Sequence, residues 1–470
     1  MNGSMKPVAV IGAGITGLTA AFYLQRAGVP VTVFEAGDRV GGAIRSRREN
    51  GYLAESGPNT ILETSPVIMQ LVRDAGLEGR RLEPDPKSEA RYLVRYGRPI
   101  AMPGSPFDFL TTKLFTFGAK LAVLREPFVS ARRDGDEESI EEFVTRRLGR
   151  EFLDHAIDAM VAGVYAGDPS RLSVQQAFPK LALLETNYGS LIKGQILGSR
   201  ERRKRGEVAK DRAPKFSFDE GLQVLPDRLQ ELLGGGVVLN TSVNSLKKIP
   251  GGWEIETCSD GGSKPSEHAA VIYAGTAHKL AGLDLNLEGD QKLDLTPFSE
   301  IRHPPVASVV LGYRREDVTH PCQGFGALIP KVEGFGILGT IFSSSLFPNR
   351  APAGHLTLTS YVGGERHPDL AGLPDEQLFE LTHRDLARLL GIKGRPTFRS
   401  LAYYPKAIPQ YNLGYGRYRE LMTAIEAREE TLFFAGHYRD GISLGDSIVS
   451  GRNIVDRVVK ALVSVHSLRP

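Results

Sequence analysis

Cysteine is scarce in this chain of 470 residues, which contains only Cys258 and Cys322. The two lie 64 positions apart with no C-x-x-C spacing, so the sequence indicates neither a zinc site nor a disulfide framework. An excess of charge is also lacking, because 58 Lys and Arg residues face 55 acidic residues and leave a formal charge of +3. This balance excludes nucleic acid as a default partner. We therefore expect no metal and a reducing, cytoplasmic location.

Long apolar runs are lacking as well. No run reaches the ~18 residues typical of a membrane span, and the first apolar stretch, from Val8 to Ile11, is too short for the core of a secretory signal. The composition, 41% hydrophobic and 24% charged, is that of a globular protein with a large core. At roughly 150 residues per domain, the length predicts two or three domains.

Glycine, in contrast, is in excess, with 52 residues where average usage would give about 33. The clearest group lies in residues 7–36, where the apolar runs VAVIG and VTVFE flank an Ala/Leu-rich stretch that ends at Gly28. This pattern predicts a strand, a helix and a strand. Neither run alternates between apolar and polar residues, which is typical of parallel strands covered on both faces.

Within this unit, Gly12, Gly14 and Gly17 form a G-x-G-x-x-G pattern directly after the first strand. Such glycines permit a tight turn, close approach of the backbone to a pyrophosphate, and close helix–strand packing. The helix N-terminus favours the phosphate charge, and Glu35, which ends the second strand, is placed to accept ribose hydroxyls. A glycine-rich turn without a ligand is the alternative, but the acid at this spacing predicts a dinucleotide site.

The rest of the chain alternates between sheet-like and helical regions. EARYLVRYGRPIAM predicts a β-hairpin that turns at Tyr96-Gly97, and residues from Pro106 to about Arg205 have a helical pattern. Strand-like runs then return, VVLNTSVNSLKKI, GWEIETC and HAAVIYAG among them. Residues from about 300 to 425 predict a sheet domain with a helical layer, and the tail predicts a strand and a helix that starts near Asp446.

Two more glycine-rich elements extend the predicted cofactor site. Gly41-Gly42, in RVGGAIRS, follows the acid directly, and the pair resembles the second glycine motif of amine-oxidase-type flavoproteins, which favours FAD over NAD. The C-terminal segment LFFAGHYRDGISLGDSIVSG supplies a second helix N-terminus able to face a flavin. Because these elements lie at the two ends of the chain, we expect one FAD domain assembled from distant segments.

Together with VYAGDPSRLS, GFGALIP and IPQYNLG, these elements resemble the protoporphyrinogen oxidase family over nearly the whole chain. Two positions depart from the family pattern. His437 follows Gly436 where many relatives have an Asp, so the contact that this Asp makes with the ribityl chain is in doubt for this sequence. Gly275-Thr276 stands where relatives often have a small residue and then Pro.

The resemblance implies an α/β fold, with a Rossmann-like FAD domain made of discontinuous segments, a mixed-sheet substrate domain and an inserted helical domain. The implied boundaries are 1–85, 211–277 and 428–470 for the FAD domain, 86–102 and 278–427 for the substrate domain, and 103–210 for the helical insertion. Within the insertion, the basic run at 200–205 is a candidate for contact with anionic lipid, and a solvated helix end is the stronger alternative.

Residues of the FAD site follow from the same resemblance. Glu55 and the segment Gly57-Pro58-Asn59 are expected to line the isoalloxazine and ribityl region, and the backbone of Val243 to meet the adenine. The full set expected to contact FAD is Gly12, Ala13, Gly14, Ile15, Thr16, Gly17, Glu35, Ala36, Arg39, Gly41, Gly42, Ala43, Glu55, Gly57, Pro58, Asn59, Val243, Gly436, Ile442, Ser443 and Leu444.

For the substrate, Arg91 matches the arginine that pairs with a propionate in this family, a role that suits a rigid bidentate donor. Without the resemblance, a solvated surface arginine is the more common finding. Ala162-Gly163 match a segment whose backbone approaches the pyrrole nitrogens. Residues expected to sandwich the tetrapyrrole are Phe325, Gly326, Leu328 and Tyr361, and core packing is the alternative for Leu328.

The implied activity is the six-electron oxidation of protoporphyrinogen IX to protoporphyrin IX, with O2 as acceptor and H2O2 as product, in haem biosynthesis. No residue is assigned as a general base. The alternatives are oxidation of coproporphyrinogen III to coproporphyrin III, an amine oxidase, and a non-enzymatic prenyl-protein chaperone of the same architecture. Peripheral contact with the inner face of the membrane and a homodimer are further expectations that the resemblance leaves open.

Overall fold

The computed structural model describes residues 5–132, 135–204, 213–259 and 262–467. Its cofactor-type sheet has five strands, all parallel. The strand Val8–Ile11 is buried along its whole length, as its apolar run without alternation predicts, whereas the strand Val31–Phe34 is buried only over its second half. The order across the sheet is β10 (Val237–Val238), β2 (Val31–Phe34), β1 (Val8–Ile11), β14 (Ala270–Tyr273) and β21 (Leu432–Phe434).

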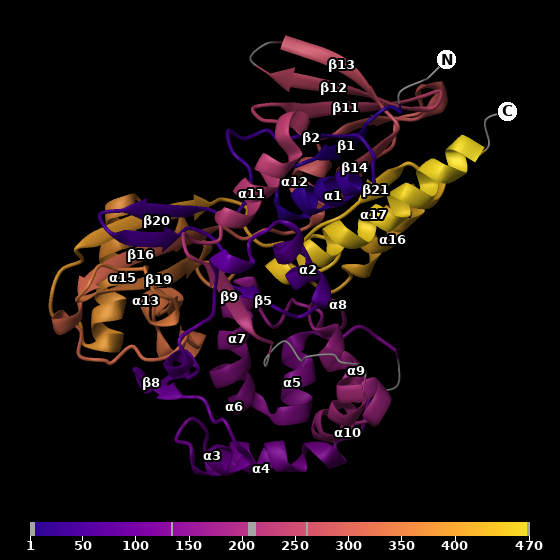
Figure 1. Ribbon diagram of the computed structural model, residues 1–470. Coiled ribbons are helices and arrows are strands. Elements are labelled where there is room, and N and C mark those ends of the chain that lie inside the picture. The colour runs from indigo at the N-terminus through magenta and orange to yellow at the C-terminus, as the bar shows by residue number, and fades with distance from the viewer. Residues whose placement is uncertain (1–4, 133–134, 205–212, 260–261, 468–470) are drawn as a thin grey trace.

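Helices from both ends of the chain pack together beside this sheet (Figure 1). A Cβ on Gly451 of the C-terminal helix would lie 2.4 Å from the carbonyl oxygen of Thr16, at the start of the first helix. Only glycine allows this approach, so the sequence of the last helix is adapted to the first. The helices of this part are α1 (Ile15–Arg26), α2 (Pro66–Asp74), α11 (Val224–Leu233), α12 (Ala277–Leu280), α16 (Gly416–Arg428) and α17 (Leu444–Ser467).

Three smaller sheets surround it. The four-stranded sheet projects at the top of Figure 1, and the short β5–β9–β6 sheet lies near the centre of the molecule. Asn240 has a left-handed φ of 51°, which separates β10 from β11, so the run that reads as one strand in the sequence forms two. The strands are β13 (Gly262–His268), β12 (Gly252–Ser259), β11 (Ser242–Ile249) and β15 (Asp284–Asn286); β3 (Ser46–Glu49) and β4 (Tyr52–Glu55); and β5 (Ile61–Leu62), β9 (Lys215–Phe218) and β6 (Arg81–Leu82).

A mixed seven-stranded sheet forms the second large unit, on the left of Figure 1. The hairpin around Tyr96 and Gly97 is present at its edge, and both turn residues have positive φ, as a two-residue hairpin loop requires. The order is β20 (Phe398–Tyr404), β16 (Val306–Arg314), β19 (His355–Gly363), β18 (Ile337–Ile341), β17 (Gly326–Leu328), β7 (Arg91–Arg95) and β8 (Arg98–Ala101). Its helices are α13 (Ser343–Leu346), α14 (Pro368–Ala371) and α15 (Asp375–Leu390).

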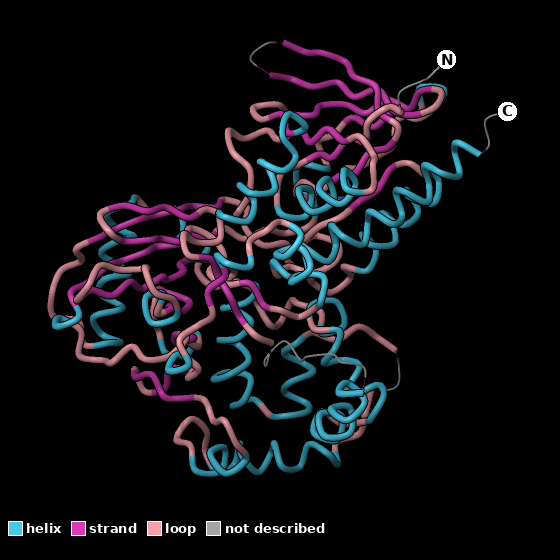
Figure 2. The backbone as a smooth tube through the Cα atoms, viewed as in Figure 1, coloured by secondary structure: helices cyan, strands magenta, loops and turns pink. Residues whose placement is uncertain are grey.

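Helices make up the third unit, at the bottom of Figure 2. Arg147 is fully buried there and binds Glu126 at 2.9 Å and also Glu185, so charged side chains as well as apolar ones hold the helices together. The helices are α3 (Pro106–Thr111), α4 (Phe117–Arg125), α5 (Ile140–Leu148), α6 (Arg150–Phe152), α7 (Asp158–Tyr165), α8 (Val174–Ala177), α9 (Pro179–Tyr188) and α10 (Leu191–Lys204). Together with the sheets, this arrangement confirms the predicted α/β fold class with an added helical part.

Candidate active site

The three glycines after β1 have three different environments. Gly12 has a φ of 103°, and a Cβ on Gly17 would stand 2.0 Å from the Gly12 carbonyl oxygen. Gly14 is the N-cap of α1 with an ordinary φ of −68°, and a Cβ there would meet no atom within 4 Å. The backbone conformation at Gly12 and the close backbone contact at Gly17 therefore require glycine. The space in front of Gly14, in contrast, is open for a phosphate group at the helix N-terminus.

Glu35 lies beside this turn. Its carboxylate accepts hydrogen bonds from the backbone N–H of Ala13 at 2.8 Å and of Gly37 at 2.9 Å. Each carboxylate oxygen has a further lone pair, so the ribose contact expected from the sequence is compatible with these bonds. The backbone N–H of Thr241, two residues before Val243, donates to the carbonyl oxygen of Glu35 at 2.8 Å. The predicted adenine and ribose contacts thus lie at the same end of the site.

The Gly41-Gly42 loop folds directly onto the first turn. The backbone N–H of Gly41 donates to the Ala13 carbonyl at 2.8 Å, and a Cβ on Gly42 would lie 3.5 Å from the Cα of Gly14. Arg39 fixes the loop, because its guanidinium donates to the carbonyl oxygens of Gly42 and Ile44, both at 2.7 Å. Arg39 is accordingly a structural support of the Gly41-Gly42 loop, a role that its position in the sequence does not reveal.

From this loop the chain leads to the segment Gly57-Pro58-Asn59. A Cβ on Gly57 would stand 2.1 Å from the carbonyl oxygen of Ala43, so the two segments are in direct backbone contact. The hydroxyl of Tyr361 donates to the Gly57 carbonyl at 3.0 Å and accepts from the side-chain amide of Asn59 at 2.7 Å. Sequence reasoning assigns Tyr361 to a substrate wall, and its hydroxyl contact with the predicted flavin loop has no local sequence signal.

Glu55 is buried and serves as a tie between segments. Its carboxylate accepts from the Ser46 hydroxyl at 2.6 Å and from the backbone N–H of Leu222 at 2.9 Å. Burial raises the pKa of Glu55 to about 7, and the hydrogen bonds and the charge of Arg350 oppose this only in part. The flavin contact expected for Glu55 stays a prediction.

The C-terminal element reaches the same region. Gly436 has a φ of 123° and donates its N–H to the hydroxyl of Ser450 at 2.9 Å. Ser443 caps α17 by accepting from the N–H of Asp446 at 3.1 Å. A Cβ on Gly445 would lie 3.0 Å from the Leu62 carbonyl oxygen, so the first turn of α17 touches β5. Ile442, Ser443 and Leu444 therefore lie at a helix N-terminus that faces the centre of the molecule.

His437, the departure from the family pattern, is half-buried. Burial, with the neighbouring His303 and His278, lowers the pKa of His437 to about 4. The imidazole is therefore neutral at physiological pH, with one donor and one acceptor nitrogen. It therefore lacks the charge of the aspartate that many relatives have at this position.

The predicted substrate residues meet on one face of the seven-stranded sheet. Leu328, Gly339 and Tyr361 stand opposite one another on three neighbouring strands, and Arg91 pairs with Gly326 two residues before Leu328. Residues opposite one another, or two apart on a strand, share a face. Arg91, Gly326, Leu328 and Tyr361 therefore share one face of the sheet.

Helix α7 approaches this face. A Cβ on Gly163 would stand 2.4 Å from a methyl carbon of Leu328, and Ala162 is buried beside Tyr361. Leu328 also packs on Leu93 and the helical unit, so the core role left open from the sequence is real as well. The structure thus brings helix, sheet and flavin loop to one place.

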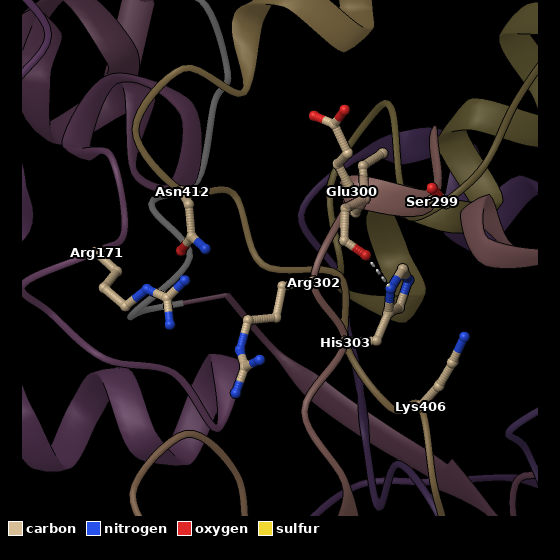
Figure 3. Close-up of a pocket in the computed structure, with 8 residues that line it drawn as sticks. Arg171, Ser299, Glu300, Arg302, His303, Lys406 and Asn412 are labelled. Atoms are coloured by element: carbon tan, nitrogen blue, oxygen red, sulfur yellow. Dashed lines mark hydrogen bonds between the residues drawn. The ribbon is translucent and has the colours of Figure 1, made fainter. Parts of the chain in front are cut away.

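A separate polar cavity of about 340 Å³ is lined by none of the predicted residues (Figure 3). Its walls include Arg171, Arg302 and Lys406, together with His303, whose Nδ1 is 2.8 Å from the carbonyl oxygen of Ile301. Arg302 and Arg171 both face the carboxylate of Glu365, so much of the positive charge is neutralised within the protein. The ring of His303 lies 5.0 Å from that of His278, and both histidines act on the pKa of His437.

Comparison with known proteins decides the family. The model of the flavin-containing amine oxidoreductases matches residues 15–459. The chain belongs to this family. Its glycine cradle fits the FAD that the family carries, because open space at Gly14 and close backbone packing at Gly12, Gly17 and Gly57 are what a bound dinucleotide needs.

Individual relatives cover the chain almost completely. It is 35% identical to protoporphyrinogen oxidase 2 of Arabidopsis thaliana, over 98% of this chain and 95% of that protein. It is 28% identical to coproporphyrinogen III oxidase of Bacillus subtilis, over 99% and 100%. A solved structure from Exiguobacterium sp. 255-15, a provisionally assigned protoporphyrinogen oxidase, has a TM-score of 0.80 at 23% identity, over 97% and 99% of the two chains. This last likeness supports the fold.

Proposed function

We propose that the protein oxidises a porphyrinogen to the corresponding porphyrin and that protoporphyrinogen IX is its substrate. The observation that carries the proposal is that Arg91, Leu328 and Tyr361 share one face of the sheet. On this face the Tyr361 hydroxyl also donates a hydrogen bond to the predicted flavin loop at Gly57. A cation at one edge and apolar side chains beyond it suit a planar ligand with carboxylates on one side. The names of the Arabidopsis and tobacco relatives support this substrate class.

In this proposal the protein binds and orients the substrate. Arg91 holds a propionate, and Leu328 with the backbone at Gly163 holds the macrocycle against the sheet. Tyr361 keeps the loop at Gly57 in place and thus the distance between the macrocycle and the cofactor. When bound, FAD supplies hydride acceptance from a bridging carbon and transfer of the electrons to O2. Three O2 are consumed and three H2O2 formed for each porphyrinogen, which accounts for six electrons.

The Bacillus relative favours a second candidate, oxidation of coproporphyrinogen III. The two substrates differ in their carboxylates, two against four, at the edges of the same macrocycle. Anaerobically prepared protoporphyrinogen IX and coproporphyrinogen III should be supplied in parallel, with porphyrin fluorescence and O2 uptake as readouts. We expect a kcat/KM at least about tenfold higher for protoporphyrinogen. The reverse preference would select the second candidate, and no oxidation of either would contradict both.

We also propose that the helical unit docks on an anionic lipid surface. Most of the basic run at 200–205 lies in α10, and Arg205 lies outside the described residues. A different surface is exposed on α3, on α4 and on the turn after them. Phe107, Phe117 and Phe128 are 72%, 82% and 87% exposed there, at the bottom of Figure 1. Lys113 and Arg125 add positive charge beside them. Among the described residues, no helix is both long and apolar enough to cross a bilayer.

A further inference from the structure

Strand β21 leads into a single helical turn at residues 436–440. The backbone N–H groups of Arg439 and Asp440 both donate to the carbonyl oxygen of Gly436, at 3.0 Å. The last carbonyl oxygens of such a turn have no partner within it, and where they are buried they need donors from elsewhere. In this protein the donors come from residues 411–419, just before and within the first turn of α16.

Side chains spaced four residues apart in this segment bind three consecutive carbonyl oxygens of the turn, one each. The hydroxyl groups of two tyrosines and the Nε of an arginine are the donors. The pairs, donor first, are Tyr411 with His437, Tyr415 with Tyr438 at 2.5 Å, and Arg419 with Arg439 at 2.9 Å. Tyr411, Tyr415 and Arg419 together form a clamp on the turn.

The side chains of the clamp also hold one another. The ring centroids of Tyr411 and Tyr415 lie 4.4 Å apart, and the guanidinium carbon of Arg419 lies 4.8 Å and 5.6 Å from them. Both tyrosines are 1% exposed. Burial raises the pKa of each phenol, so both hydroxyl groups stay protonated and able to donate.

Tyr411 has a second contact, just beyond the turn. Its hydroxyl accepts a hydrogen bond from the backbone N–H of Gly441 at 3.1 Å, while it donates to the carbonyl oxygen of His437. One hydroxyl thus joins two backbone groups four residues apart. The path of the chain between β21 and α17 is therefore tied to this hydroxyl group.

The clamped turn lies beside the predicted cofactor cradle. A Cβ on Gly436 would lie 3.7 Å from the hydroxyl oxygen of Thr16, in α1. The turn also follows the carboxyl end of a parallel strand, where sheets of this type bind dinucleotides. His437, within the turn, occupies the position at which many relatives have the Asp that contacts the ribityl chain.

The clamp is anchored on the helical unit as well. A guanidinium N–H of Arg419 donates to the side-chain oxygen of Gln176, in α8, at 2.6 Å. The backbone N–H of Ser173, the N-cap of α8, donates to the carbonyl oxygen of Tyr411 at 2.9 Å. The turn at 436–440 is thereby linked to the helical unit through the side chains of the clamp.

We propose that the clamp sets the position of residues 436–440 against bound FAD, and that the hydroxyl of Tyr411 fixes the backbone at His437 for contact with the ribityl chain. Tyr411, Tyr415 and Arg419 are positioning residues, since they act on the cofactor through the backbone of the turn. The inference goes beyond the proposed function, because it holds for any substrate that the flavin oxidises.

The test compares FAD with ADP, which lacks the ribityl chain and the flavin ring. Tyr411→Phe keeps the aromatic ring and removes both hydrogen bonds of the hydroxyl. Calorimetric titration measures the Kd of each ligand for the full chain freed of FAD. We expect the Kd for FAD to rise about tenfold and the Kd for ADP to stay unchanged, because only the ribityl end of the site is displaced.

Visible circular dichroism of the FAD-loaded protein gives a second readout. The bands of a bound flavin report its immediate surroundings, whereas a loss of fold stability alone leaves them in place. In Tyr411→Phe these bands should shift.

Tyr418→Phe is the matched control, since Tyr418 follows in the same helix and is 6% exposed. Its hydroxyl accepts from Arg417 at 2.6 Å and donates to Glu300 at 3.2 Å, in an exposed ion pair. This variant should keep both Kd values and the flavin bands. Tyr415→Phe, which frees the carbonyl of Tyr438, should weaken FAD binding in the same way and replaces Tyr411→Phe if that variant does not fold.

Unchanged FAD affinity in both Tyr411→Phe and Tyr415→Phe would overturn the role of the clamp. An equal loss of FAD and ADP affinity would overturn it too, because general damage to the cofactor unit gives that result. Loss of FAD affinity with ADP affinity retained supports it.

Discussion

The hydroxyl of Tyr361 donates a hydrogen bond to the carbonyl oxygen of Gly57, 3.0 Å away, and joins segments 304 residues apart in the chain. Tyr361 belongs to the seven-stranded sheet, and Gly57 to the predicted flavin loop. Asn59 completes the contact by donating to the same hydroxyl. The hydroxyl thus fixes the spacing between this sheet and the Gly57 loop.

Replacement of Tyr361 by Phe removes this contact and leaves the ring in place. We expect the free energy of unfolding to fall by about 1–2 kcal/mol, because buried polar groups lose a partner. The flavin absorption band should shift, and kcat should fall more than substrate affinity. Thermal unfolding and visible spectra measure these effects. Tyr403→Phe, at a tyrosine that is 48% exposed, is the control and should leave both unchanged.

The different environments of Gly14 and Gly17 predict different outcomes for the same substitution. Gly14→Ala should leave the apoprotein as stable as before, because its φ is ordinary and its Cβ meets no atom, yet FAD affinity should fall at least about tenfold. Gly17→Ala should lower the melting temperature of the apoprotein itself, because its Cβ would stand 2.0 Å from the Gly12 carbonyl oxygen. Calorimetry of the apoprotein and flavin titration separate the two. Full FAD affinity in Gly14→Ala would contradict a phosphate position at this helix end.

Glu55 predicts a pH dependence of stability. Its pKa is raised from 4.5 to about 7 on folding, so the folded state binds the proton more tightly. The contribution of this group to the free energy of unfolding is therefore largest below pH 4.5, falls as the pH rises to about 7, and is lost above that. Its full size is about 3 kcal/mol.

Glu55→Gln should flatten this part of the profile, which urea unfolding between pH 5 and pH 8 measures. Glu220→Gln, at an exposed neighbour, should keep the slope of the unaltered protein. An identical slope in both variants would show that the Glu55 carboxyl does not titrate in this range.

The exposed phenylalanines of the helical unit predict lipid binding. The triple variant Phe107→Ser, Phe117→Ser and Phe128→Ser should lose at least about tenfold in affinity for vesicles with phosphatidylglycerol in a cosedimentation assay. Val332→Ser with Val463→Ser, at exposed apolar residues elsewhere, should bind as the unaltered protein does. Equal binding by all three proteins would refute this docking surface.

Local features were predicted from the sequence more completely than distant contacts. The turn at Gly12 to Gly17 and the hairpin at Tyr96-Gly97 depend on neighbouring residues, so their patterns were sufficient. The contact of Tyr361 with Gly57 depends on which strands pair across the molecule, and no short pattern contains that information.

The packing of α17 on α1 has a consequence for synthesis of the protein. The first helix and the glycine turn precede Gly451 and strand β21 by more than 400 residues. A growing chain that has not yet reached these segments leaves the β14 edge of the sheet unpaired and α1 without its partner helix. The sheet of the cofactor-type unit is therefore completed only after these late segments have been made.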